Sequence, residues 1–133
     1  MNALKIGQHC SVHKGIYAGI ARSYNNEPES HIILLDAKSP EEYMNWVEAT
    51  EWAESLGEAT GLPTKGEAAL VGCNLTEELG DCGYVWTSTS DGAHSAWCQY
   101  WFSSIPDHQY SFGKTVTSRV RAVKRLPVTY TTN

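Results

Sequence analysis

Residues 84–102 read YVWTSTSDGAHSAWCQYWF. Two runs rich in aromatic and hydroxyl side chains, Tyr84–Ser90 and Ser95–Phe102, flank the dipeptide Asp91-Gly92. Such runs on either side of a glycine-containing turn are typical of antiparallel strands. Two further β-rich runs follow in the sequence, Gln109–Lys114 and Thr117–Leu126. The C-terminal part of the chain is therefore predicted to form an antiparallel sheet.

The N-terminal part predicts a second pair of strands. Residues 15–22 and 30–36 are apolar and β-branched, and Asn25-Asn26 between them are typical turn residues. The two strands are expected to form a hairpin with a longer loop. Because the second run has no alternation of apolar and polar residues, we expect it to be buried on both faces.

Helices are predicted between these two groups of strands. Ser39-Pro40-Glu41-Glu42 has the pattern of a helix start, and the helix is expected to run to about Leu56, with Gly57 as its stop. Thr64-Lys65-Gly66-Glu67 is a second capping pattern, which opens a short helix through about Gly72. Leu75–Leu79 adds one further turn. The order strands, helices, strands predicts an α+β fold.

Length and composition limit the classes of function. The chain has 133 residues, which fits one domain, and its net charge of −5 argues against binding to nucleic acid. No apolar run is long enough for a membrane helix, and Met1–Gln8 lacks the apolar core of a signal peptide. A cytoplasmic location is expected, with the four cysteines as reduced thiols.

Charge is divided along the chain. Residues 36–60 carry seven acidic residues and one lysine, whereas residues 109–133 carry five basic residues and no acidic one. The acidic helix face, with Glu48, Glu51 and Glu54, is either an ordinary solvated surface or a patch that engages a basic partner. Both interpretations stay open at this point.

Known catalytic and metal-binding patterns do not emerge from the sequence. There is no Gly-x-Ser-x-Gly motif, and Pro63 interrupts the one stretch that resembles a phosphate-binding loop. His9-Cys10-x-x-His13 and the series Cys73, Cys82, His94 and Cys98 contain metal-ligand residue types, but their spacing fits no paired motif. We therefore predict no catalytic residue, no metal and no cofactor, and a protein that is not an enzyme.

Several motifs in their order resemble one family. They are Leu62-Pro63-Thr64-Lys65-Gly66-Glu67, Trp86-Thr87-Ser88-Thr89, Ala96-Trp97 and Val120-Arg121-Ala122-Val123-Lys124-Arg125. Together they are similar to the Lcl C-terminal domain-like family, a family of unknown function in bacterial and phage proteins, over about residues 30–126. The resemblance implies a C-type-lectin-like fold, with two short helices packed on antiparallel sheets, related to formylglycine-generating-enzyme-like domains.

The resemblance also implies roles for single residues. Trp86, Trp97 and Trp101 are expected to point inward, and Trp46 is expected to join them in the core. Arg121 is expected to tie the last strand to the turn at residues 86–89 by charge-assisted hydrogen bonds.

An aromatic surplus remains after this assignment: the chain has five Trp and seven Tyr but only two Phe. The residues without an obvious core role flank the loop at 103–107; they are Tyr100, Phe102, His108 and Tyr110. Tyrosine offers a large contact area at a small entropy cost, which suits recognition. These residues predict either a ligand-binding surface or a second sheet face covered by the N-terminal hairpin.

Three functions compete on these observations. The favoured one is a non-enzymatic binding domain for a protein or glycan ligand, encoded by a phage or mobile element and either cytoplasmic in the host cell or virion-associated. The second is a phage-encoded inhibitor that contacts a host protein through Glu48, Glu51 and Glu54. The third is an enzyme of the formylglycine-generating type, which would need a reactive pair among Cys73, Cys82 and Cys98. The protein is expected to be a monomer or a homodimer.

Overall fold

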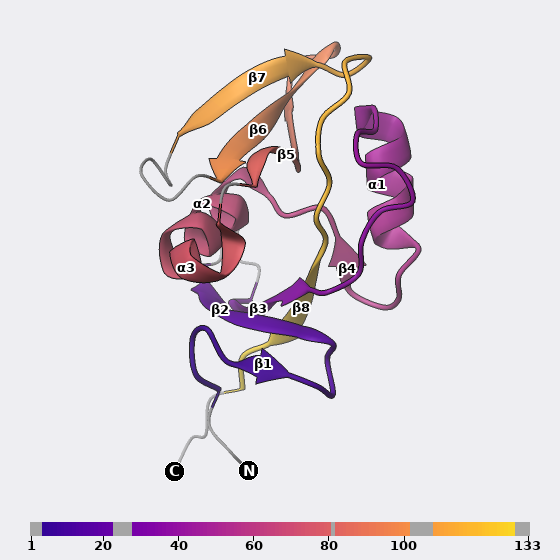
Figure 1. Ribbon diagram of the computed structural model, residues 1–133. Helices are drawn as coiled ribbons and strands as arrows, with labels where there is room; N and C mark the ends of the chain where they lie inside the picture. Colours follow the sequence, from indigo (N-terminus) through magenta and orange to yellow (C-terminus); the bar gives the residue numbers. More distant parts are fainter. Residues whose placement is uncertain (1–3, 23–27, 81, 102–107, 130–133) are drawn as a thin grey trace.

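The computed structural model describes residues 4–22, 28–80, 82–101 and 108–129, and within them the fold is α+β with antiparallel sheets (Figure 1). The larger sheet contains, in spatial order, β1 (His9–Cys10), β2 (Gly15–Ala21), β3 (Ser30–Leu35), β8 (Val123–Pro127) and β4 (Thr60–Gly61). The smaller sheet contains β5 (Gly83–Asp91), β6 (Ser95–Trp101) and β7 (Gln109–Gly113). The helices in the described residues are α1 (Trp46–Glu54), α2 (Lys65–Asn74) and α3 (Thr76–Leu79).

The predicted N-terminal hairpin is confirmed. Strands β2 and β3 pair in antiparallel fashion from Gly15↔Leu35 to Ala21↔Ser30. Ile32 and Ile33 are 0% exposed although they point to opposite faces of the sheet. The apolar run is therefore buried on both faces, as its lack of alternation predicts.

The prediction of one long last strand over Thr117–Leu126 is wrong in its first half. Ser118 and Arg119 form isolated bridges to Met44 and Val85, and β8 begins only at Val123. Figure 1 shows this segment running from the smaller sheet, past α1, down to the larger sheet. The chain passes from one sheet to the other here. The continuous β-rich sequence is therefore divided between isolated bridges in its first half and the larger sheet in its second half.

The predicted start of the first helix at Ser39 is also wrong. Met44 is held in an extended bridge with Ser118, with hydrogen bonds in both directions at 2.9 Å between backbone nitrogen and oxygen. A helix from residue 40 would break that pairing. Asn45 caps α1 instead, its side chain accepting a hydrogen bond from the Glu48 amide, and the helix ends at Glu54 rather than Leu56.

The second helix forms as predicted. The Thr64 hydroxyl accepts from the Glu67 amide at 3.1 Å, and the Thr64 amide donates to the Glu67 carboxylate at 2.8 Å. This is a complete capping box. Helix α2 then extends to Asn74, and α3 provides the predicted further turn.

The core contains two groups of buried residues, each centred on one tryptophan. Trp86 packs with residues from α1, β6 and the 118–122 segment, and Trp101 packs with residues from α2 and the larger sheet. Both indoles are 0% exposed. This confirms the inward orientation expected for these two residues.

Three indole nitrogens donate to backbone carbonyls far away in the sequence. Trp46 Nε1 donates to Thr87 at 2.9 Å, Trp86 Nε1 to Met44 at 2.8 Å, and Trp101 Nε1 to Ala68 at 2.9 Å. We call these the indole bonds. They satisfy the polar atom of each buried or partly buried indole while they join separate elements.

Trp97 does not occupy the expected core position: it is partly buried, belongs to neither core group, and has the Lys65 ammonium 3.6 Å from the centre of its ring. Trp46 is also partly buried, but it packs against the first core group. Strand β6 is buried on both faces, with Ala96 and Cys98 in the first core group and Trp101 in the second. Alternation along β6 therefore cannot define one inward face.

No helix within the described residues is long and apolar enough to span a membrane.

Candidate functional site

Aromatic side chains collect on one face of the smaller sheet. Its registers place Tyr84 opposite Tyr100, and Cys98 opposite Tyr110. Because every second residue of a strand points to the same face, this face also carries Phe112 from β7. With His108, which directly precedes β7, these rings form a set that we call the aromatic cluster: Tyr84, Tyr100, His108, Tyr110 and Phe112.

The rings of the aromatic cluster are in mutual contact. The Tyr84 ring centre lies 4.4 Å from that of Tyr100 and 5.2 Å from that of Phe112. The His108 and Tyr110 centres are 4.4 Å apart, with the ring planes at 67°. Tilted and edge-on arrangements of this kind are favourable for aromatic quadrupoles. The cluster is therefore a packed unit rather than a group of independent side chains.

One side of the cluster joins the core and the other is open. Trp86, Ala96 and Cys98 on the same face are fully buried, whereas Tyr110 is 45% exposed. Burial raises the pKa of Tyr84, and the neighbouring Tyr110 and Tyr100 add to this shift. Tyr84 is therefore a neutral hydrogen-bond donor at physiological pH.

Three of the four aromatic residues predicted as a site lie together in this cluster. They are Tyr100, His108 and Tyr110; the fourth, Phe102, lies outside the described residues. The core group against which Tyr84 and Phe112 pack contains Met44 and Val120 as well as Tyr17, Ile33 and Leu35 of the N-terminal hairpin. The sequence prediction missed Tyr84 and Phe112. The predicted hairpin around Asp91-Gly92 pairs the strand of Tyr84 with that of Tyr100, but the two residues are placed opposite each other only when the register is known.

Cys98 lies opposite Tyr110 on the same sheet face as the cluster and is fully buried. Burial raises its pKa to about 12, and its thiol donates a hydrogen bond to the Ser118 hydroxyl, whose effect opposes the shift. Since only the thiolate is a strong nucleophile, Cys98 is inert near neutral pH.

We expect this inertness to be visible in alkylation experiments. With iodoacetamide at pH 8, mass mapping of native protein should show exposed Cys73 labelled while Cys98 stays unmodified until urea unfolds the chain. Raising the pH to 9 should speed the labelling of Cys73 far more than that of Cys98, because pH 9 is still well below the pKa of Cys98 of about 12. Equal native labelling of the two thiols would contradict the assignment.

The carboxylates of α1 predicted as a partner surface are exposed. Glu48, Glu51 and Glu54 form no ion pair within the described residues. Glu54 is the last residue of the helix, and no basic residue occupies the last turn. Negative charge at this end is unfavourable with the helix dipole, so Glu54 does not stabilise the helix, whereas Glu48 lies in the first turn, where negative charge is favourable.

Arg121 does not tie the last strand to the turn at residues 86–89. Its Nη2 donates to the carbonyl of Leu35 at 3.0 Å, so it fastens the 118–122 segment to the end of β3. Its neighbour Arg119 pairs with Glu42 at 3.1 Å and donates to the Tyr43 hydroxyl. Both arginines line a shallow cleft of about 610 Å³.

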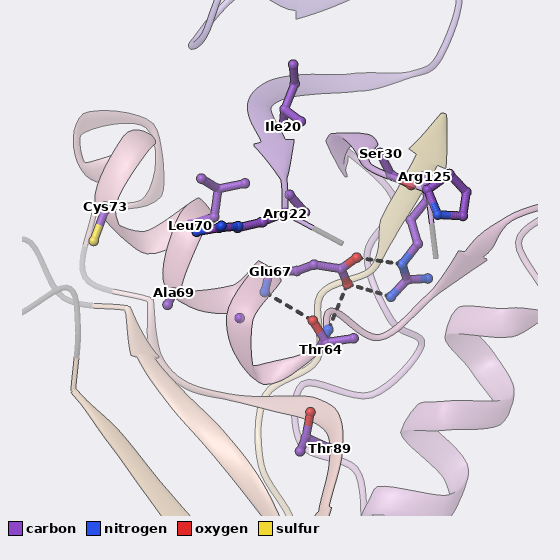
Figure 2. Close-up of a pocket in the computed structure, with 13 residues that line it drawn as sticks. Ile20, Arg22, Ser30, Thr64, Glu67, Ala69, Leu70, Cys73, Thr89 and Arg125 are labelled. Atoms are coloured by element: carbon purple, nitrogen blue, oxygen red, sulfur yellow. Dashed lines mark hydrogen bonds and ion pairs between the residues drawn. The ribbon is translucent and has the colours of Figure 1, made fainter. Parts of the chain in front are cut away.

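A larger cleft of about 740 Å³ lies beside α2 (Figure 2). The Glu67 carboxylate forms two hydrogen bonds with the Arg125 guanidinium, at 2.7 and 2.6 Å, and Arg125 also donates to the Leu62 carbonyl. Ile20 and Leu70 supply apolar wall. The carboxylate and the guanidinium neutralise each other and use their hydrogen-bonding atoms in this contact. We therefore interpret the pair as a structural link between α2 and β8.

Metal and disulfide chemistry receive no support from the described part of the chain. No group of three or more His, Cys, Asp or Glu side chains is placed there to hold a metal ion. All four cysteines are free thiols, with Cys98 buried and Cys73 exposed.

No family model matches this sequence, and a search of curated proteins finds no match either.

Proposed function

We propose that this protein is a non-enzymatic recognition domain with a C-type-lectin-like fold, encoded by a phage or mobile element, which binds a protein or glycan ligand through the aromatic cluster. The observation that carries the proposal is the convergence of Tyr100, His108 and Tyr110 with Tyr84 and Phe112 on one partly open sheet face.

The chemistry of the cluster supports this role. Tyrosine rings offer apolar faces to a sugar ring or an apolar side chain, and their hydroxyls offer hydrogen bonds. The cluster is held from below by the core, so little conformational entropy is lost when a ligand orders it. The 45% exposed ring of Tyr110 is the part most available for contact.

The test is a binding comparison between the native protein and a Tyr100→Ala/Tyr110→Ala variant. Each is immobilised and exposed to a glycan array and to host-cell lysate. We expect a ligand of the native protein to bind the variant at least about tenfold more weakly, because tyrosine is enriched among interface hot spots, whose truncation costs about 2 kcal/mol or more.

A matched control is Tyr43→Ala, which removes a tyrosine of similar exposure, 50%, outside the cluster. It should leave binding unchanged. Circular dichroism and urea unfolding verify that the double variant is folded. Undiminished binding by a folded double variant would refute the proposed site.

The acidic surface of α1 provides the alternative, an inhibitor that engages a basic host protein. The exposed state of Glu48, Glu51 and Glu54, which form no ion pair in the part of the chain that the structure describes, favours keeping it as the second candidate. Reversal of these three charges to lysine in the same binding assay separates the two functions. A complex that high salt and charge reversal both abolish, but that survives Tyr100→Ala/Tyr110→Ala, supports the inhibitor and not the aromatic site.

A further inference from the structure

Strand β7 is one of the two outer strands of the smaller sheet, and the hydrogen bonds to β6 determine the direction of its backbone groups. The Tyr100 amide donates to the His108 carbonyl at 2.7 Å, and the Lys114 amide donates to the His94 carbonyl at 2.8 Å. In an antiparallel ladder the bonded residues recur every second position. Tyr110 and Phe112 therefore direct their backbone groups to β6.

The intervening residues, Gln109, Ser111 and Gly113, direct their backbone groups away from β6. Among the described residues, the Gly113 carbonyl is the one outward group with a partner, the Val116 amide at 3.0 Å. Gln109–Gly113 contains no charged residue and no proline, the devices that usually prevent an edge strand from pairing. The side chain of Gln109 donates to the Lys65 carbonyl and to the Gln99 side-chain oxygen, and its outward backbone groups have no hydrogen-bond partner among the residues that the structure describes.

We propose that β7 pairs with β7 of a second copy of this chain, in antiparallel orientation about a two-fold axis at Ser111. We choose a second copy as the partner because Ser111 lies at the middle of the strand. With the two-fold axis at Ser111, its outward amide and carbonyl meet the carbonyl and amide of Ser111 in the other copy. Gln109 lies opposite Gly113 of the other copy at both ends, where the Gly113 amide is the group left to pair because its carbonyl already accepts from Val116. The edge is thus self-complementary about Ser111, as an isologous interface requires.

This register also determines which side chains meet across the axis. Tyr110 lies opposite Phe112 of the other copy, on the face that carries the aromatic cluster. Tyr110 and Phe112 of the other copy form a pair that is not hydrogen-bonded through the backbone. In such pairs the Cα atoms and side chains lie closer together than in hydrogen-bonded pairs, and aromatic pairs at these positions are favourable. The ring of Tyr110, which already contacts His108, gains Phe112 of the other copy as a further neighbour, and the two aromatic clusters join into one continuous face.

The interface is a short strand edge that buries little surface, so we expect the dimer to be weak. Sedimentation velocity of the full chain, without any ligand, should show the mean mass rising from 14.7 kDa toward twice that value over roughly 10 µM to 1 mM. In the dimer range, the Ser111 amide should become protected from hydrogen exchange. The Tyr110 amide, which faces β6, should be protected at every concentration.

Ser111→Pro removes the outward amide without touching the ladder to β6, and should weaken self-association at least about tenfold. Ser111→Lys is the second variant, because it places like charges opposite each other across the axis. Ser111→Thr, which retains the amide and adds no charge, is the control and should dimerise normally. Circular dichroism verifies that each variant is folded.

A mean mass that stays at the monomer value up to about 1 mM overturns the proposal. So does a dimer that persists in folded Ser111→Pro and Ser111→Lys variants, because it must use another surface. Since the experiment contains no ligand, its result is independent of the proposed recognition function: failure of self-association leaves ligand binding by the aromatic cluster to be judged on its own assay.

Discussion

Trp86→Ala should lower the free energy of unfolding by about 3–5 kcal/mol, the range found when a large buried aromatic side chain is truncated. Trp86 is 0% exposed and lies in the core group between α1, β6 and the 118–122 segment. Its removal opens a cavity at the point where the chain changes sheets, so the surroundings have little freedom to collapse. Urea unfolding followed by circular dichroism measures the loss.

Two further variants show which property of Trp86 matters. Trp86→Phe removes the indole bond to Met44, but the Met44 carbonyl still accepts from the Ser118 amide, so this variant should lose much less stability than Trp86→Ala. Trp97→Ala truncates a partly buried indole of the same sheet and should also cost less. If Trp97→Ala and Trp86→Ala were equally destabilising, the assignment of Trp86 to the core centre would be incorrect.

Gly15→Ala should be the most damaging single-methyl change among the described glycines. A Cβ atom at Gly15 would lie 2.3 Å from the Leu34 carbonyl oxygen and 2.6 Å from Ile33 Cγ2. One of these obstacles is backbone of the adjacent strand, which can move only if the β2–β3 pairing opens. We expect a loss of at least about 1–3 kcal/mol, the usual cost of overpacking.

The matched control is Gly66→Ala, the same chemical change at the start of α2. A Cβ atom there meets nothing within 4 Å, and no unusual backbone conformation is required. This variant should instead raise the free energy of unfolding by about 0.4–1 kcal/mol, because alanine restricts the unfolded chain. Urea midpoints that move in the same direction for both variants would contradict the packing of Gly15 against β3.

The sequence predicts elements well where their determinants are local. The Thr64 capping box needs only residues 64–67, and it forms as expected. The capping pattern at Ser39 is equally good locally, yet the bridge between Met44 and Ser118, which are far apart in the chain, overrides it. Helix starts are thus predictable only where no distant strand competes for the same backbone.

The candidate site shows the same division. Tyr100, His108 and Tyr110 were accessible to sequence reasoning because they flank one loop, and the structure places them together. Tyr84 joins them through the register of β5 with β6, which a bulge between Trp86 and Ser90 shifts. No sequence pattern reveals that shift, because it depends on how two strands pair.

The indole bonds have a consequence for the order in which the molecule assembles. They join residues 41, 42 and 33 positions apart in the chain, so none can form before large loops have closed. Contacts of such sequence separation slow folding and make it cooperative. The smaller sheet, which contains Trp86, Trp97 and Trp101, is then not expected to retain its tryptophan packing as an isolated fragment. The tryptophan fluorescence of the chain should reach its native value in one late step.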